Sequence, residues 1–365
     1  MKLKRSGDKP KTKTSLYDNG LFISVIALGV SIVISAIILA ACGYNPFVAY
    51  SAIVTGAFGS LRGFAQTLTQ ATPLIFTGLA FTFAKKANLI NLGVEGQMYM
   101  GALGAALIGT MDLGIPSALH ILLAVVVGFV FGALFGAIIG FLKVKFDSNE
   151  VVAGVMLNEV AVCFINYLLN GPLLAEGSSV AQTERVVEAA RLPRIFTSYQ
   201  VTIAVFLAVG VCFVIKWFMS NTALGYEIRN VGFNKKASET AGINIGKALI
   251  LATLVSGGIA GLAGVNQVLG VDRRLISEFS PGYGFNGIAV AALAADDPLG
   301  VILAGLIFGV LRAGALELNR STGIPVEFVD VIQAMVVIFV SAPLMIKHMG
   351  KIKNSFGKKT VKGEV

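Results

Sequence analysis

Charged residues are scarce in this 365-residue chain: only 13% of its residues are Asp, Glu, Lys or Arg, while 55% are hydrophobic. The mean hydropathy is +0.80. Soluble globular domains carry about 25% charged residues, which keep their surfaces in water. So little charge excludes an ordinary soluble domain, and we expect lipid to be the main solvent of this chain.

Residues that hold metals or perform catalysis are also rare, with only three cysteines and two histidines in the chain. Cys42, Cys163 and Cys212 show no CxxC spacing, and neither His120 nor His348 lies near one of them in the sequence. Ser/His/Asp and HExxH arrangements are absent from the sequence as well. We therefore expect no metal site and no catalytic residue, and we interpret the cysteines as small apolar side chains.

A nucleotide-binding motif is missing too. The pattern G-x-x-x-x-G-K-[ST] does not occur, and the nearest fragment, residues 357–360 (GKKT), lacks its spacing. The chain is expected to bind no cofactor itself, so any use of ATP would need a separate subunit.

Long apolar runs are what the chain has in abundance. A helix needs about 20 apolar residues to cross a hydrocarbon core of roughly 30 Å, and backbone groups in lipid must be satisfied within the segment. These runs predict an all-α polytopic membrane protein with about ten transmembrane helices. The ten segments are approximately 22–42, 64–84, 88–110, 116–142, 150–170, 199–219, 247–270, 284–296, 298–319 and 327–346.

Lysine and arginine divide unevenly between the two ends of these segments. If the N-terminus is cytoplasmic and ten spans alternate, every lysine falls on the inner side and the outer side receives only arginines. This predicts a membrane protein with both termini in the cytoplasm, and topology then explains the net charge of +9 without nucleic acid. We expect basic tails at 1–20 and 347–365 and one transmembrane domain at 21–346.

The third and eighth segments are poor simple spans, because residues 88–100 and 283–296 contain closely spaced glycines and polar side chains. They occupy matching positions if the first five and last five spans form two inverted halves. Broken helices at such positions predict a central pathway. Alternatively, the glycines only let neighbouring helices approach closely.

Amide side chains recur within the predicted spans, and Gln66, Gln70 and Thr77 share one face of a helix. This interior is expected to be short of cations, which favours an uncharged, hydroxyl-bearing or heterocyclic solute. Polar faces also join membrane helices to one another, so that interpretation stays open. The candidate pathway residues are Gln66, Gln70, Asn91, Glu95, Gln97, Asn158 and Asn286.

Glu95 is the one carboxylate among these candidates. An ionised group at the bilayer centre costs about 3 kcal/mol, so it should face protein or water. It would be either a proton or ligand site, as in a proton-coupled secondary transporter, or a structural carboxylate that accepts backbone hydrogen bonds from the broken segment.

The polar segment 222–245 lies between two long apolar stretches. Asn234 is a suitable N-cap, residues 235–241 provide about two helical turns, and Gly242 suits the position after the helix. So short a helix must be braced by its own spans or by a partner. It is either a solvated connector or a cytoplasmic surface on which a separate motor subunit pushes.

Four separated motifs resemble one family, in the same order along residues 60–345: residues 88–97 (NLINLGVEGQ), 155–158 (VMLN), 225–243 (GYEIRNVGFNKKASETAGI) and 283–300 (YGFNGIAVAALAADDPLG). They resemble the permease subunits of bacterial ABC importers of the ribose, branched-chain amino acid and nucleoside group. The last motif, the chain length and the outer loop 171–198 resemble the purine-nucleoside permeases most.

This resemblance implies a permease of the bacterial cell membrane that translocates a nucleoside, with a simple sugar as the alternative. It also implies a second permease subunit in a homo- or heterodimer, cytoplasmic ATPase subunits that hold ATP and Mg, and an external binding lipoprotein or periplasmic binding protein. The residues it assigns to ATPase coupling are Gly225, Arg229, Gly232, Asn234, Ala237, Glu239, Ala241 and Gly242.

The chain departs from the nucleoside branch at three places. Asn286 stands where an Asp is usual, residues 295–297 (ADD) replace an Asn-rich turn, and Glu159 occupies a position where an aromatic residue is common. These departures leave the exact solute open.

Overall fold

The computed structural model describes residues 20–339 apart from 197, 326 and 337. Within this part the chain is helical, and its only β-type pairings are two isolated bridges in the loops. The predicted all-α class is confirmed. The predicted tail 347–365, nearly all of the tail 1–20 and the end of the segment 327–346 lie outside the described residues.

Twelve α-helices are named in the described part, and the π-helical turn η3 (Gln267–Val271) continues α10 without a break. A 3-10 turn, η2 (Glu188–Ala190), lies in the loop after α6, and helical backbone resumes at 327–336. In chain order the helices are α1 (Gly20–Ala41), α2 (Pro46–Phe58), α3 (Leu61–Lys86), α4 (Val94–Gly109), α5 (Ser117–Phe146), α6 (Glu150–Leu169), α7 (Ala204–Asn221), α8 (Ala223–Phe233), α9 (Lys235–Thr240), α10 (Ile245–Asn266), α11 (Tyr283–Leu293) and α12 (Gly300–Thr322).

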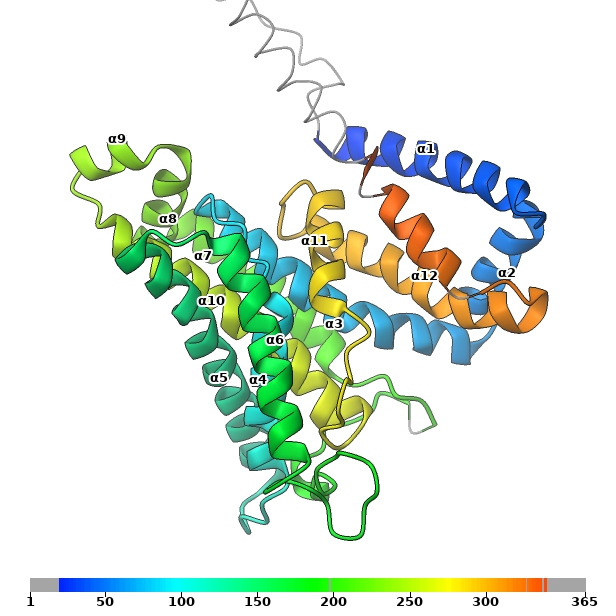
Figure 1. The fold of residues 1–365 in the computed structure, drawn as a ribbon, viewed down its shortest axis with the longest axis horizontal. Coiled ribbons are helices and arrows are strands. Elements are labelled where there is room, and N and C mark those ends of the chain that lie inside the picture. Colours follow the sequence, from blue (N-terminus) through cyan, green and yellow to red (C-terminus); the bar gives the residue numbers. More distant parts are fainter. Residues whose placement is uncertain (1–19, 197, 326, 337, 340–365) are drawn as a thin grey trace, which may run out of the picture.

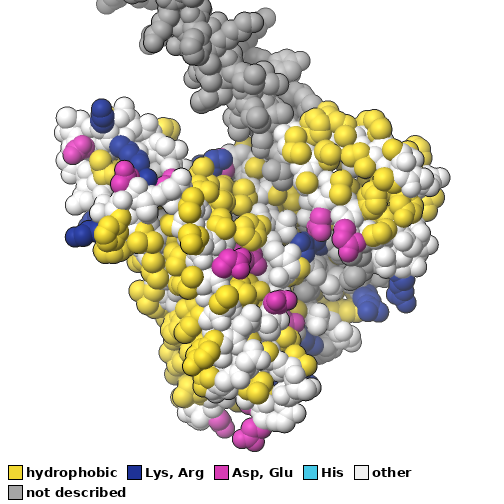
Figure 2. All heavy atoms as spheres, viewed as in Figure 1, with side chains coloured by type: hydrophobic (Ala, Val, Ile, Leu, Met, Phe, Trp, Pro, Cys, Tyr) yellow, Lys and Arg dark blue, Asp and Glu magenta, His cyan; other side chains and the backbone are white. Residues whose placement is uncertain are grey.

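Several of these helices are long and apolar enough to cross a membrane. By length and composition, five candidate spans are found in the described residues: Ser117–Phe146, Glu150–Leu169, Ala204–Asn221, Ile245–Val271 and Gly300–Thr322. Figure 2 shows apolar side chains along the flank formed by α5 and α6, and Leu134 and Val160 there are more than half exposed. Such surfaces are typical of a multi-pass membrane protein.

The helices form two groups that share α3 (Figure 1). On one side α4, α5 and α10 pack against one another, and α6 packs against α4. On the other side α12 packs against α2, and α1 adjoins α2. Helix α3 contacts α10 from the first group and α12 and α11 from the second, so it connects both halves of the molecule.

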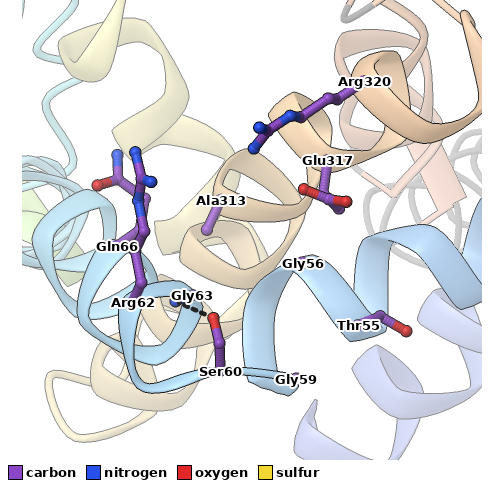
Figure 3. A pocket seen from close by; sticks show the side chains of 10 residues that line it. All are labelled: Thr55, Gly56, Gly59, Ser60, Arg62, Gly63, Gln66, Ala313, Glu317 and Arg320. Carbon is purple, nitrogen blue, oxygen red and sulfur yellow. Dashed lines mark hydrogen bonds between the residues drawn. The ribbon is translucent and has the colours of Figure 1, made fainter.

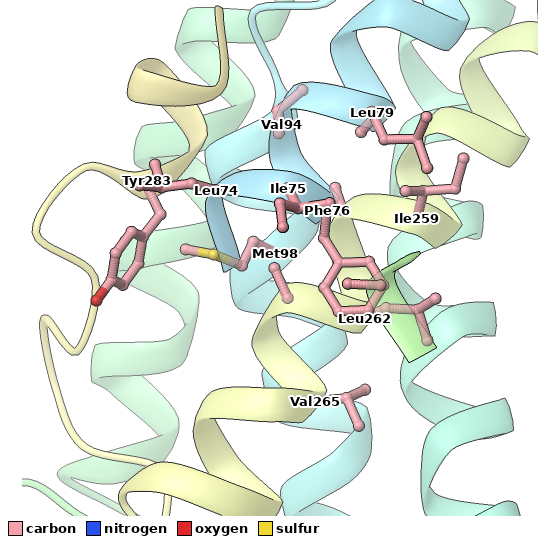
Figure 4. Packing of buried hydrophobic residues seen from close by; sticks show 14 of the residues in the cluster. Leu74, Ile75, Phe76, Leu79, Val94, Met98, Ile259, Leu262, Val265 and Tyr283 are labelled. Carbon is pink, nitrogen blue, oxygen red and sulfur yellow. The ribbon is translucent and has the colours of Figure 1, made fainter. Parts of the chain in front are cut away.

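The larger apolar core lies where α3, α4, α10 and α11 meet (Figure 4). Phe76 of α3 and Met98 of α4 are fully buried there, beside Ile259 and Leu262 of α10. A smaller apolar cluster joins α1, α2 and α12.

Glycines bring α5 and α10 into backbone contact. On α5 they recur at every fourth position, so they form one stripe. A Cβ added at Gly132 would lie 2.5 Å from the carbonyl oxygen of Gly257, and one at Gly136 would clash with the carbonyl oxygen of Thr253. Small residues thus give this pair the close packing that is characteristic of membrane helices.

Two helices were absent from the sequence prediction. Helix α2 is apolar, but its 13 residues are too few for a span, and span length was the criterion. Its start is capped by Asn45, whose Oδ1 accepts a hydrogen bond from the Phe47 N–H at 3.0 Å. Helix α8 was not predicted either, because only the short helix at 235–241 was expected in the segment 222–245.

Candidate functional site

The start of α4 is held by a buried network of neutral amides. Asn91 and Gln97 exchange two hydrogen bonds: Asn91 Nδ2 donates to Gln97 Oε1 at 3.0 Å, and Gln97 Nε2 donates to Asn91 Oδ1 at 3.1 Å. Asn91 Nδ2 also donates to Ser256 Oγ of α10 at 2.9 Å. Asn91 and Gln97 are 1% and 0% exposed, so this network is closed to solvent.

Asn158 of α6 completes the same site. Its Oδ1 accepts a hydrogen bond from the Gly96 N–H at 2.8 Å, and its Nδ2 donates to the carbonyl oxygen of Leu92 at 2.8 Å. The first turn of a helix has N–H groups without partners inside the helix. One side chain therefore satisfies both a free N–H of α4 and a carbonyl of the loop before it.

The start of α11 is held differently, by Glu95 in the first turn of α4. Glu95 Oε2 accepts a hydrogen bond from the Gly284 N–H at 2.5 Å, and the Ser280 side chain and the Phe285 backbone lie against the same carboxylate. Helix α11 follows Gly282, which has a φ of +81° and offers no side-chain cap. The carboxylate of one short helix thus caps the N-terminus of the other, where the helix dipole favours an anion.

Gly284 makes this approach possible. A Cβ at this position would lie 2.5 Å from the backbone nitrogen of Glu95 and 2.6 Å from its Oε2. The starts of α4 and α11, which the sequence placed in the third and eighth segments, therefore meet in backbone contact.

Tyr283 links α11 to the polar face of α3. Its hydroxyl donates to Gln70 Oε1 at 2.6 Å, and Thr77 Oγ1 donates to its carbonyl oxygen at 3.0 Å. Asn286, one turn further along α11, donates from Nδ2 to the carbonyl oxygen of Gly282 at 2.9 Å.

Arg312 places a cation beside Tyr283. It lies within α12, with its guanidinium carbon 5.5 Å from the centre of the Tyr283 ring, and its Nη2 donates to the carbonyl oxygen of Pro281 at 2.9 Å.

Gln66 lies apart from the buried candidates and lines a cavity of about 530 Å³ between α2, α3 and α12 (Figure 3). The other predicted pathway residues do not line this cavity. The structure therefore brings Asn91, Glu95, Gln97 and Asn158 together at the α4 start. Gln70 and Asn286 lie near Tyr283, and Gln66 lies at the end of α3 beyond them.

The segment 222–245 contains the predicted short helix. Asn234 Oδ1 accepts a hydrogen bond from the Ala237 N–H at 3.2 Å, and Gly242 has a φ of +80° just after the helix. The predicted N-cap, helix and terminating glycine are confirmed, although α9 is assigned from Lys235 to Thr240. Ala237, Glu239 and Ala241 are exposed.

Helix α8 presses directly on the end of α3. A Cβ at Gly232 would clash with the carbonyl oxygen of Lys86, and one at Gly225 would clash with that of Phe218 at the end of α7. Arg229, on the same helix, is partly buried. No side chain separates the backbones at these two contacts.

The turn between α11 and α12 lies at this same end of α3. Lys85 Nζ is 2.8 Å from Asp296 Oδ2, and Lys216 Nζ of α7 is 3.6 Å from Asp297 Oδ1. Asp297 Oδ2 also accepts a hydrogen bond from the Gly300 N–H at 3.0 Å, capping α12. The ADD turn thus connects α3, α7 and α12 beside α8.

Residues 63–341 match the family described as the permease component of branched-chain amino acid transport systems. The chain belongs to this family. It is also similar to known ABC transporter permeases along almost its whole length. The guanosine ABC transporter permease NupP of Bacillus subtilis is 36% identical over 91% of this chain and 97% of its own.

Two further relatives are named for different solutes. The nucleoside ABC transporter permease NupB of Lactococcus lactis is 32% identical over 90% of this chain and 93% of its own. The glucose ABC transporter permease TsgB13 of Haloferax volcanii is 31% identical over 86% of this chain and 85% of its own. The chain is thus a translocation subunit of the ABC transporter class.

Proposed function

We propose that this permease belongs to an ATP-driven importer whose solute is a nucleoside. The observation that carries the proposal is its end-to-end similarity to NupP and NupB, with the glucose permease slightly more distant. The polar face of α3 supports it, because the partly exposed amides of Gln66 and Gln70 are neutral donors and acceptors of the kind that an uncharged, heterocyclic solute requires.

The proposed membrane arrangement has ten spans in two inverted halves, with both termini in the cytoplasm. Helices α4 and α11 are its two interrupted elements, and the meeting of their N-termini around Glu95 supports that pairing. Residues 21–346 form one permease domain, with 222–245 as its cytoplasmic coupling segment and basic tails on either side.

In the proposed mechanism, separate ATPase subunits bind ATP and Mg and push on α8 and α9. Their contact residues are those predicted above, with Arg229 and Glu239 at the centre of the segment. The Gly232 contact passes the displacement to α3, which at 26 residues is about 39 Å long and reaches the opposite end of the molecule. The polar contacts of Tyr283 with α3 then carry it to α11.

The remaining proposed parts are a second permease subunit and an external binding protein that delivers the solute. The chain itself supplies no catalytic residue and binds no cofactor. Asn91, Gln97 and Asn158 serve this mechanism by holding the start of α4, because their polar atoms are engaged with protein.

Uptake by a deletion strain tests the proposal. Labelled guanosine uptake should be lost on deletion and restored by the wild-type gene, and glucose uptake should be unaffected. Depleting ATP should abolish uptake, whereas a proton ionophore that leaves ATP intact should not. Loss of glucose uptake alone would favour the sugar alternative, and sensitivity to the ionophore would favour proton coupling through Glu95. Co-purification without crosslinking should recover the ATPase subunits.

A further inference from the structure

The cavity beside Gln66 has the size of a small-molecule site (Figure 3). Its volume of about 530 Å³ falls within the range of roughly 300–1,000 Å³ that is typical of such sites. Its walls come from α2, α3, α12 and the loop between the first two. The lining residues that carry charges or amides are Arg62, Gln66, Glu317 and Arg320.

Glycines shape the base of this cavity. A Cβ at Gly56 of α2 would lie 2.5 Å from the Cβ of Glu317, and one at Gly63 of α3 would clash with the carbonyl oxygen of Gly56. The three helices therefore touch here, and their contact fixes the start of the Glu317 side chain. In Figure 3, Glu317 and Arg320 project from α12, and Arg62 and Gln66 lie together on α3 across the cavity.

The charges in the cavity are not paired with one another. Among the residues that the structure describes, no carboxylate oxygen lies within 4.0 Å of a guanidinium nitrogen of Arg62 or Arg320, and Glu317 takes part in no ion pair. Glu317 is partly buried by the cavity wall, whereas both arginines are exposed. The carboxylate oxygens of Glu317 therefore remain free to accept hydrogen bonds from a ligand.

The position of the cavity fits a site that receives solute from outside. It lies at the Leu61 end of α3, and the opposite end, at Lys86, contacts α8 of the coupling segment. If ATPase subunits act at α8, the cavity opens at the other side of the membrane.

We infer that this cavity is an outer recognition site for a riboside. The Glu317 carboxylate accepts hydrogen bonds from the vicinal 2′- and 3′-hydroxyls of the sugar, and Arg62 and Gln66 donate to the polar edge of the base. A carboxylate beside guanidinium and amide donors offers acceptors to hydroxyls and donors to ring acceptors, which suits a neutral ligand that carries both. This inference rests on the proposed function and adds the groups that choose the solute.

The test compares guanosine with 2′-deoxyguanosine in proteoliposomes that contain the whole importer and its binding protein. The measured quantity is the uptake efficiency for guanosine divided by that for 2′-deoxyguanosine. The contribution of the binding protein cancels when this ratio is compared between variants. In Glu317→Gln this ratio should fall about tenfold, since a charge-assisted hydrogen bond to the 2′-hydroxyl becomes a weaker neutral one. In Gln66→Met, uptake of both solutes should fall equally, because both carry the same base.

Glu188→Gln is the matched control, since Glu188 is an exposed carboxylate of the loop after α6 that pairs with Arg191 outside the cavity. Its ratio should equal that of the wild type. An equal fall in the uptake of both solutes by Glu317→Gln would overturn the inference. It would indicate that the charge of Glu317 serves the docking of the binding protein. An unchanged ratio would overturn it as well. Wild-type vesicles that import glucose and no guanosine would instead refute the proposed function itself.

Discussion

The two short helices that meet in the interior of this permease begin in opposite ways. At the start of α4, neutral amides from Asn91, Gln97 and Asn158 satisfy the loop and the first turn from three directions. At the start of α11, the carboxylate of Glu95 holds the N–H of Gly284, and that carboxylate belongs to α4. The difference is that neutral amides of α4, its preceding loop and α6 hold the start of α4, whereas a charged side chain of α4 holds the start of α11.

The largest expected effect comes from breaking the neutral side of this comparison. Asn158→Ala leaves the Gly96 N–H and the Leu92 carbonyl buried without partners. Each unsatisfied group costs about 1–3 kcal/mol, so the free energy of unfolding should fall by about 3 kcal/mol. Thermal unfolding of the purified permease in detergent measures it. Glu159→Ala, at an exposed position next along α6, is the control and should change little.

The next effect concerns the contact that would move α11 through α3. Gly232→Ala places a Cβ against the carbonyl oxygen of Lys86 and should force α8 away from α3 at a cost of about 2 kcal/mol. ATP hydrolysis by the complex should continue while uptake falls, which parallel assays in proteoliposomes would detect. Gly210→Ala on α7, where a Cβ meets nothing within 4 Å, should behave as wild type. Normal coupling in Gly232→Ala would contradict transmission through this contact.

A smaller effect is expected on the charged side. Glu95→Gln keeps an acceptor for the Gly284 N–H but exchanges a charge-assisted hydrogen bond for a neutral one, at a cost of about 1 kcal/mol. The variant should unfold at a slightly lower temperature and should still import solute in an ATP-dependent manner. Complete loss of uptake with unchanged stability would show that the carboxylate works as a proton or ligand site instead.

The smallest expected effect concerns the ion pair just after the C-terminal end of α11. Lys85→Met removes the ion pair with Asp296, in which both side chains are partly exposed. Such a pair contributes about 0.5 kcal/mol. The free energies of unfolding of Lys85→Met and of the wild type should differ by no more than this amount. The difference should become smaller when both proteins are measured at higher salt, because salt screens the ion pair. A loss as large as that of Asn158→Ala would mean that the α11 turn, and not the α4 start, is the more firmly built element.

The all-α fold class and the local signals that begin and end a helix could be predicted from the sequence alone. Long apolar runs require helices in lipid, and Asn234 and Gly242 mark the ends of α9 through interactions a few residues long. The partners of the interior side chains could not be predicted in the same way. Asn158 contacts Gly96, and Glu95 contacts Gly284, across separations of 62 and 189 residues that only the packed helices bring together.

The glycine stripe of α5 has a practical consequence for measuring motion in this transporter. A probe attached at Gly132 or Gly136 would force α5 and α10 apart. Leu134, on the same helix, is 60% exposed and lies outside the contact with α10. A spin label at Leu134 would therefore leave the contact between α5 and α10 intact. Distances from it to a second label on α8 would record how far α8 moves relative to α5 during each turnover.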